Sequence, residues 1–249
     1  MSVTHPLGIQ SKKPEEIEKV DPKFVQEKLL WARDQSWKVY SEIKEELKPG
    51  MTENDCRKMA LKIFESHDVK KHWHKPYIRF GTGTTLTFRD PDQKDAVIKE
   101  NDLIYLDLGP SWPDPESDLE YEGDVGNTFC LGADPEAQRC ADAARTIFHT
   151  VETEWANHQL TGTELYDRAI ELTKELGYLF TENIDGHRIS DFPHMKHSKE
   201  RLKNIAFHPK AELWVLEVHI QDPKRRFGAF IEDMLIKNRS KDDVLNSEE

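Results

Sequence analysis

Apolar residues at partly helical spacing open the ordered part of the chain. In residues 24–47 they alternate with charged side chains, which predicts an amphipathic helix. Lys48-Pro49-Gly50 would end this helix, because proline cannot continue it and glycine tolerates a left-handed cap. Thr52, with Asp55 three residues later, is typical of the N-cap of a second, shorter helix.

The same order of elements recurs further along the chain. A helix from about 136 to 155 precedes Thr161 and Glu164, which stand at the spacing of a capping pair, and the helix that they begin ends at Gly177. A long helix, a turn, a shorter helix and then strands, written twice, favours two related α/β halves with a cleft between them. Two unrelated helix pairs would share part of this pattern and remain the alternative.

The strand-like stretch 103–129 carries two aspartates among apolar residues. Asp107 lies inside LIYLDLG and Asp124 precedes VGNTF. If these runs pair as an antiparallel hairpin, both carboxylates point to one face, and the acidic segment 110–122 is the connecting loop. A carboxylate among strand-forming residues is costly to bury without a compensating charge. The pair therefore predicts a bound cation.

Two further strands each contain a glutamate where the pattern calls for an apolar residue. These are Glu217 in LWVLEVHI and Glu232 in FGAFIEDMLI. An ionised glutamate inside a β-run is expected to be paired or bound to a metal ion. Exposure on an edge strand would account for one such acidic residue, but less well for all three of Asp107, Glu217 and Glu232.

Histidines His187 and His194 follow in the second half, and each alone is more simply a surface residue. Four carboxylates and one imidazole suit Mn, Fe, Co or Zn in a dinuclear site, in which carboxylates bridge two ions. Without ions these carboxylates would repel one another. In chain order the expected carboxylate ligands are Asp107, Asp124, Glu217 and Glu232, with one of the two histidines between the two pairs.

Composition narrows the class of protein. The 249 residues are 37% hydrophobic and 33% charged, without an apolar run of membrane-spanning length or a secretory signal, so we expect a cytoplasmic protein. Three cysteines without metal-site spacing are expected to be reduced packing residues. A net charge of −12 argues against nucleic-acid binding. No membrane contact is expected either, and residues 1–20 are expected to form a mobile or surface-lying arm.

Several separated motifs in this order resemble one known family. The segments read KPGMTE, IYLDLG, EGDVGNTF, DGHRISDFPH, LWVLEVHI and GAFIEDMLI. They are similar to the signatures of the superfamily of methionine aminopeptidase, aminopeptidase P, prolidase and creatinase, across residues 24–237. The resemblance implies the α+β pita-bread fold, a pseudo-two-fold duplication around a curved antiparallel sheet. It predicts one catalytic domain over 21–249, with repeats at about 21–130 and 135–237.

The resemblance also implies a two-metal mechanism. One ion is bound by Asp107 and the other by His187 and Glu217, with Asp124 and Glu232 bridging both. A metal-bridging hydroxide would attack an amide carbonyl. His194 and Glu217 are the implied catalytic residues: His194 contacts the carbonyl and Glu217 shuttles the proton. The cofactors are two divalent ions, of Mn, Co, Fe or Zn.

The positions that meet the substrate depart from the family pattern. Thr87 and Phe88 stand where the first-half histidine is expected, and Phe230 stands where prolidase-like enzymes have an arginine. GHGIG has become GHRIS, and the ligand glutamate is followed by Val218 and His219 instead of proline. His72 or His74 could replace the missing histidine, although a surface position is the simpler expectation. The candidate substrate-binding residues are His74, Phe88, Arg188, His219 and Phe230.

Three functions remain open. The first is an aminopeptidase or Xaa-Pro dipeptidase-like metallohydrolase acting on a peptide or small amide. The second is a creatinase-like hydrolase of a small non-peptide C–N bond, which the rewritten substrate positions would suit. The third is a non-catalytic binding module on the same fold, although such modules usually lose metal ligands. A homodimer is common among prolidase-like relatives. The acidic segment 110–122 is expected to form a rim over the site.

Overall fold

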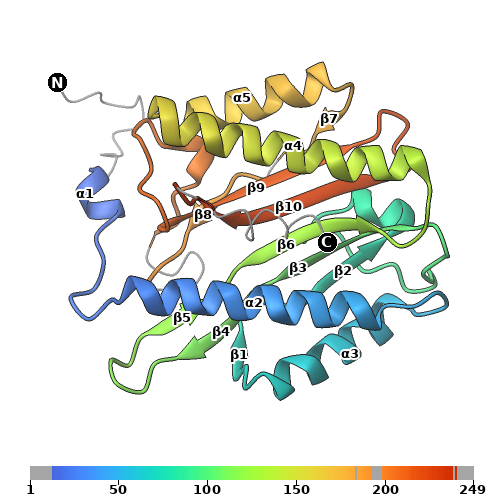
Figure 1. Ribbon diagram of the computed structural model, residues 1–249, viewed down its shortest axis with the longest axis horizontal. Helices are drawn as coiled ribbons and strands as arrows, with labels where there is room; N and C mark the ends of the chain where they lie inside the picture. The colour runs from blue at the N-terminus through green and yellow to red at the C-terminus, as the bar shows by residue number, and fades with distance from the viewer. Residues whose placement is uncertain (1–12, 183, 192–197, 238, 240–249) are drawn as a thin grey trace.

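A computed structural model describes residues 13–182, 184–191, 198–237 and 239 of the chain. Helices α4 and α5 run along one side of the molecule and α2 and α3 along the other, with the strands between them (Figure 1). Among the helices of these residues, none is long and apolar enough to cross a membrane.

The first helix pair consists of α2 (Gln26–Glu46) and α3 (Glu53–Ser66). The hydroxyl of Thr52 accepts a hydrogen bond from the Asp55 backbone N–H, and the Asp55 carboxylate accepts one from the Thr52 backbone. This capping box confirms the predicted start of the shorter helix. The second pair consists of α4 (Pro135–His158) and α5 (Gly162–Glu175).

The start and end of α5 follow the same local rules. Thr161 and Glu164 form a second capping box. Gly177 has φ of +82° just after the helix, and the backbone N–H of Tyr178 bonds back to the carbonyl of Thr173. A residue with a side chain is strained in this left-handed conformation, so glycine suits the position.

The main sheet has seven strands. Its order is β2-β3-β6-β10-β9-β7, and β8 also pairs with β9. Its strand pairs among the described residues are all antiparallel. The bounds are β2 Tyr77–Phe80, β3 Leu103–Leu108, β6 Val125–Cys130, β7 Leu179–Phe180, β8 His187–Arg188, β9 Trp214–Gln221 and β10 Gly228–Met234.

The two faces of this sheet differ in character. Alternate side chains of β9, from Trp214 to Ile220, join Ala229 and Ile231 of β10 in a hydrophobic cluster with α4 and α5. Ile104 and Leu106 of β3 pack with α2 and α3 in a second cluster. Because side chains alternate along a strand, Asp107, Glu217 and Glu232 point away from these helix-covered positions.

The acidic segment between the two aspartates is not an open loop. It forms β4 (Pro110–Pro113) and β5 (Glu120–Glu122), which pair with each other and with β1 (Lys71–His72) in a second, three-stranded sheet. The chain therefore passes directly from the large sheet into the small one and back. The prediction of a connecting loop over 110–122 was wrong, because the β3–β6 hairpin continues as β4–β5.

The N-terminal segment is packed against the rest of the chain at Ile17 and Glu18. A short helix, α1 (Pro14–Ile17), places Ile17 in the cluster around α4 and α5. Glu18 is 5% exposed, and its carboxylate accepts hydrogen bonds from the Trp214 indole and the Lys210 backbone. Residues 1–12 of the expected arm lie outside the described residues, whereas its last part contacts the second half of the chain.

Candidate metal centre

Three acidic side chains lie in one row across the main sheet. Asp107 on β3 and Glu232 on β10 are both paired with Gly126 of β6, and Glu232 is paired with Glu217 of β9. The row therefore brings carboxylates from both halves of the chain to one place. Ligand oxygens of Asp107, Asp124 and Glu232 all lie within 4.8 Å of one another.

Asp124 lies at the junction of the two sheets, directly before β6, and is 1% exposed. Its Oδ2 lies 2.9 Å from Nε2 of His187, which is equally buried on β8. Pairing of β8 with β9 at Val215 positions His187 near the row of carboxylates. The structure therefore brings Asp124 and His187, two of the predicted ligands, together.

Glu217 is held in place by the backbone. Its Oε2 accepts a hydrogen bond of 2.8 Å from the N–H of Gly186, the residue before His187. The hydroxyl of Tyr166 on α5 bonds to the backbone carbonyl of Glu217 from the helix side of the sheet. These contacts fix both the strand and the carboxylate, which leaves the second carboxylate oxygen to meet a ligand.

The carboxylates perturb one another strongly. Burial, followed by the charges of Asp124, Asp107 and Glu217, raises the pKa of Glu232 well above its usual value. Burial also raises the pKa of Asp107 to about 6, although His74 acts in the opposite direction. Carboxylates placed this close together need protons or cations between them.

His74 lies inside this cluster instead of on the surface. Its Nε2 is 3.3 Å from Oδ1 of Asp107 and 3.5 Å from Oδ1 of Asp124. Burial lowers the pKa of His74, but Asp107, Asp124 and Glu122 more than offset this and raise it to about 10. The simple expectation of a surface histidine was therefore wrong at this position.

The residues present fit a site for divalent metal. Oε1 of Glu232 is buried and has no hydrogen-bond partner among the described residues. Together with Asp107, Asp124 and Glu217, it offers mainly oxygen donors, with the imidazole of His187 beside them. Carboxylates plus imidazole are the donor set of Mn, Fe, Co and Zn centres.

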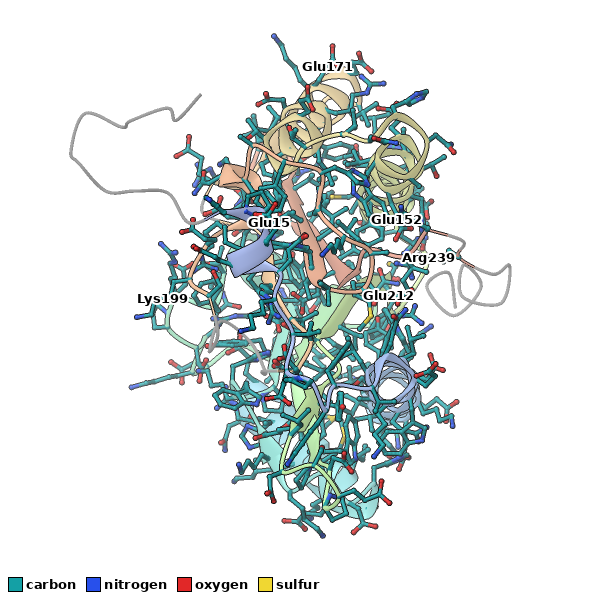
Figure 2. All side chains as sticks on the ribbon, turned by 90° about the vertical axis from the view of Figure 1, so that its left-hand side faces the viewer. Glu15, Glu152, Glu171, Lys199, Glu212 and Arg239 are labelled. Carbon is teal, nitrogen blue, oxygen red and sulfur yellow. The ribbon has the colours of Figure 1, made fainter. Side chains whose placement is uncertain are left out.

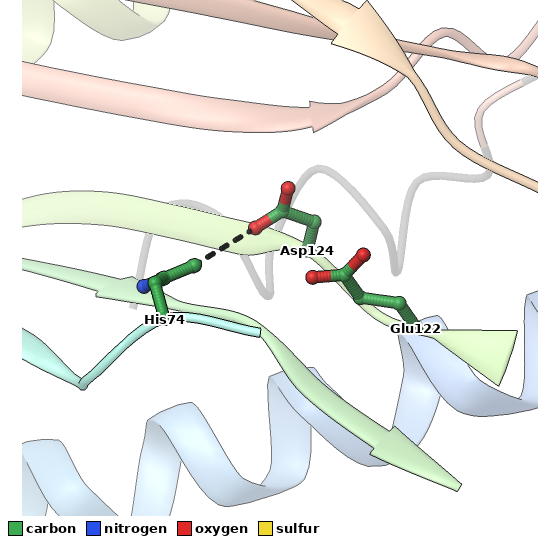
Figure 3. Close-up of side chains that lie close together, drawn as sticks. All are labelled: His74, Glu122 and Asp124. Carbon is green, nitrogen blue, oxygen red and sulfur yellow. Dashed lines mark hydrogen bonds and ion pairs between the residues drawn. The ribbon is translucent and has the colours of Figure 1, made fainter. Parts of the chain in front are cut away.

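Glu122 was not among the residues predicted for the site. It is fully buried at the end of β5, and its carboxylate lies within 4.8 Å of ligand atoms of His74 and Asp124. Figure 3 shows Glu122 and Asp124 on one continuous stretch of chain, with His74 approaching from another segment. A signal was present in the sequence, since Glu122 is two residues before Asp124, but the loop-like composition of the segment hid it.

An aromatic cluster lies next to the row of carboxylates formed by Asp107, Glu232 and Glu217. His219 and Phe230 are paired across β9 and β10, two residues along from Glu217 and Glu232 and on the same face. Their rings lie 5.9 Å apart, and the Tyr105 ring lies within 5.8 Å of both. The structure therefore brings these two predicted substrate residues to the side of the carboxylates.

The turn just before Thr87 and Phe88, the positions where the family histidine was expected, contacts this cluster. In η1 (Gly81–Thr85), the carbonyl of Thr84 accepts a hydrogen bond of 2.8 Å from Nε2 of His219. The Tyr105 hydroxyl donates to the carbonyl of Leu86. Burial lowers the pKa of His219 to about 4, so its ring is neutral, and its Nδ1 has no hydrogen-bond partner among the described residues.

The remaining predicted residues lie elsewhere. Arg188 follows His187 on β8 and is paired with Trp214, so it projects to the opposite side. It donates to Asp191 and to the carbonyl of Lys19, a role in holding the N-terminal segment. Phe88 is 41% exposed, and Arg89 stacks over its ring. His194 lies outside the described residues.

Comparison with known proteins agrees with this arrangement. A model of the metallopeptidase family M24 matches residues 27–238. No curated protein matches the chain. Among solved structures, prolidase from Pyrococcus furiosus superposes with a TM-score of 0.65 at 22% identity, covering 91% of this chain and 62% of that one.

Two further structures extend the likeness. Dipeptidase PepE from Mycobacterium ulcerans has a TM-score of 0.67 at 17% identity, covering 91% of this chain and 57% of that one. Methionine aminopeptidase from Rickettsia prowazekii has a TM-score of 0.65 at 12% identity, covering 87% and 96%. The chain thus spans about three fifths of the prolidase and PepE chains.

A helix-covered antiparallel sheet with a carboxylate-rich centre at its middle defines the metallopeptidase class of pita-bread folds. The chain belongs to metallopeptidase family M24. The predicted superfamily and fold class are therefore confirmed.

Proposed function

We propose that the chain is a dinuclear metal-dependent hydrolase of amide bonds, an aminopeptidase or Xaa-Pro dipeptidase-like enzyme. The observation that carries the proposal is the meeting of Asp107, Asp124 and Glu232 oxygens within 4.8 Å, beside His187. A buried acidic cluster of this kind has a clear use only with cations. The solved relatives named prolidase, dipeptidase and methionine aminopeptidase favour a peptide substrate.

The two ions would be held by the five residues predicted from the sequence: Asp107, Asp124, His187, Glu217 and Glu232. When bound, divalent ions would lower the pKa of water and polarise the amide carbonyl. Mn, Co, Fe and Zn all suit these donors. Glu217, oriented by the Gly186 N–H, is the group we assign to proton transfer from water to the leaving nitrogen.

The aromatic cluster would contact the substrate beside the ions. Tyr105, His219 and Phe230 present a closed apolar surface, with His219 tied to the η1 turn. Such a surface suits a compact apolar side chain or a proline ring. His194 keeps its proposed contact with the substrate carbonyl, by resemblance to the family alone.

Hydrolysis assays on the metal-loaded protein test this proposal. The chain would be loaded with Mn or Co and assayed on Xaa-Pro dipeptides, peptides with N-terminal methionine, and small non-peptide amides including creatine. Cleavage of a peptide bond supports the proposal. Cleavage of creatine-like compounds alone would favour the second function, and inactivity on every amide with two ions bound would contradict both.

Assembly and location are further parts of the proposal. A homodimer would resemble the prolidase-like enzymes, and light scattering of the purified chain would test it. All three cysteines are free, which agrees with a reducing compartment such as the cytoplasm. Fractionation of the source cells would test that location.

A further inference from the structure

Two histidines flank Asp124, one on each of its oxygens. His187 Nε2 lies 2.9 Å from Oδ2, and His74 Nε2 lies 3.5 Å from Oδ1. His74 also lies 3.3 Å from Oδ1 of Asp107. The two imidazoles come from different halves of the chain, since His74 precedes β2 and His187 belongs to β8. Asp124 therefore has an imidazole on both sides.

Both histidines are oriented by the same backbone contact. His74 Nδ1 lies 3.0 Å from the carbonyl of Lys75, and His187 Nδ1 lies 3.2 Å from the carbonyl of Arg188. A carbonyl can only accept, so Nδ1 carries the hydrogen in each bond. In the neutral ring this leaves the lone pair on Nε2, directed at the carboxylates. Metal-binding histidines are held in this way, with the far ring nitrogen donating to a backbone carbonyl.

The spacings also match ligands that share an ion. Nitrogen and oxygen ligands lie about 2.0–2.2 Å from a transition metal ion, so two neighbouring ligands lie roughly 3 to 3.5 Å apart. His74 stands 3.3 Å and 3.5 Å from oxygens of Asp107 and Asp124. The 2.9 Å between His187 and Asp124 is close to the same range. His74 thus has the geometry of a ligand.

We propose that His74 is a nitrogen ligand of the ion held by Asp107 and Asp124, so that each ion of the centre is bound by one histidine. The family resemblance assigns a histidine only to the other ion. This inference rests on the two-metal centre proposed above. Imidazole on both ions would favour Zn, Co or Fe over the hard ions Mg and Ca.

Glu122 belongs to the same side of the centre. It is fully buried, and its carboxylate lies within 4.8 Å of ligand atoms of His74 and Asp124. Gly109 provides the space for both side chains. A Cβ at this position would lie 2.6 Å from His74 Nε2 and 2.8 Å from Glu122 Oε1. The missing side chain at 109 is therefore what lets His74 and Glu122 come together at the ion, where Glu122 supplies a further oxygen.

X-ray absorption spectroscopy of the zinc-loaded chain tests the assignment, because it counts imidazoles per ion. With two ions and two histidine ligands, the wild-type chain should average about one imidazole per ion. At a zinc concentration that fills both sites, His74→Ala and His187→Ala should each lower this to about half. The matched control is His158→Ala, which removes an exposed imidazole at the end of α4 and should leave the count unchanged.

Calorimetric titration with Zn²⁺ gives a second readout. His74→Ala should weaken one of two binding steps by at least the roughly 10–100-fold that loss of a group behind a metal ligand costs. Gly109→Ala removes no ligand but pushes His74 and Glu122 aside, so it should reproduce both the lower imidazole count and the weaker step. Glu122→Gln should weaken the same step and keep the imidazole count.

The outcomes separate this inference from the proposed function. A wild-type chain that binds two ions with about half an imidazole per ion would overturn the role of His74. An unchanged imidazole count in His74→Ala or Gly109→Ala would overturn it as well, with the two-metal centre intact. Failure of the wild-type chain to bind any divalent ion would overturn the proposed function itself.

Discussion

Glu232 and Asp233 are neighbours on β10, and their side chains enter opposite environments. Asp233 points to the helix-covered face, where Arg33 of α2 donates two hydrogen bonds of 2.8 and 2.7 Å and Arg239 donates one of 2.7 Å. The Trp37 indole adds a fourth donor. Burial alone would raise the pKa of Asp233, but the two arginines lower it to about 2.

Glu232 has the reverse surroundings. The charges nearest to it are those of Asp124, Asp107 and Glu217, and with burial they raise its pKa well above the usual value. Strand β10 therefore carries two buried carboxylates in opposite surroundings: Asp233 lies among arginines, and Glu232 lies among other carboxylates. The comparison shows that, on the helix-covered face, the protein's own arginines neutralise the buried carboxylate of Asp233. On the other face, the proposed function leaves the neutralising charge to bound metal ions.

The network around Asp233 ties the two halves together. Arg239 also binds Glu152 of α4, with nitrogen–oxygen distances of 2.7 and 2.8 Å (Figure 2). The arginines thus connect α2, α4 and β10 through buried ion pairs. Buried pairs of this kind are destabilising to break, because the remaining charge is left without compensation.

The largest effect is expected at the bridging position of the acidic cluster. Asp124→Asn removes a charge that both ions would share, so bound metal and hydrolytic activity should fall together. The loss should exceed the roughly 10–100-fold that removal of a group behind a ligand costs. Elemental analysis and an amide hydrolysis assay measure both. Asp118→Asn makes the same change at an exposed position of the adjoining hairpin. Unchanged metal content in Asp124→Asn would count against the site.

The same chemical change on the other face should act on stability. Asp233→Asn leaves Arg33 and Arg239 without their carboxylate, and we expect a loss of about 3–5 kcal/mol in the free energy of unfolding. Denaturant unfolding measures this loss, with Asp118→Asn as the control. A loss below about 1 kcal/mol would show that the arginines are satisfied without Asp233.

Acid should remove the contribution of Asp233 in a defined range. Its pKa is lowered from 3.8 to about 2 in the folded chain. A lowered carboxyl pKa stabilises the fold above the unfolded value, and this stability is lost as the pH falls through the folded value. We expect about 2 kcal/mol to disappear between pH 4 and pH 2. Wild-type and Asp233→Asn chains should converge over this range, and parallel curves would refute the assignment.

The smallest effect should have the opposite sign. Glu232→Gln in the metal-free chain relieves the crowding of carboxylates, so we expect the free energy of unfolding to rise, by about 1 kcal/mol as is common for a single substitution. The exposed Glu45 offers a matched glutamate-to-glutamine control. A destabilised Glu232→Gln chain without metal would place Glu232 in the same structural category as Asp233.

Much of the fold was predictable because local rules decide it. The threonine caps at Thr52 and Thr161 define where α3 and α5 begin, and the carboxylates of the row across the main sheet interrupt otherwise apolar strands. The segment 110–122 was mispredicted, since its prolines and acidic residues resemble a loop. Pairing between β4, β5 and β1, a contact distant in sequence, turns it into a sheet.

The rest of the site depends on contacts that a sequence pattern does not carry. β8 has only two residues, so no periodicity indicated that His187 faces the centre while Arg188 faces away. His74 reaches the carboxylates only because β2 pairs with β3 at Tyr77 and Asp107. Glu232 and Asp233 are adjacent acids, and the sequence could not show which partners each would meet across the sheet.

The most direct test compares unfolding of the wild-type, Glu232→Gln and Asp233→Asn chains, each without metal and with Mn²⁺ at about 100 times the dissociation constant of the wild-type chain. Ions should stabilise wild-type and Asp233→Asn chains by at least about 2.7 kcal/mol, the value for one filled site. They should stabilise Glu232→Gln much less, because a ligand of the ions is lost. Equal stabilisation of all three chains, or none in the wild type, would contradict the claim that the carboxylates on this face are neutralised by bound metal ions.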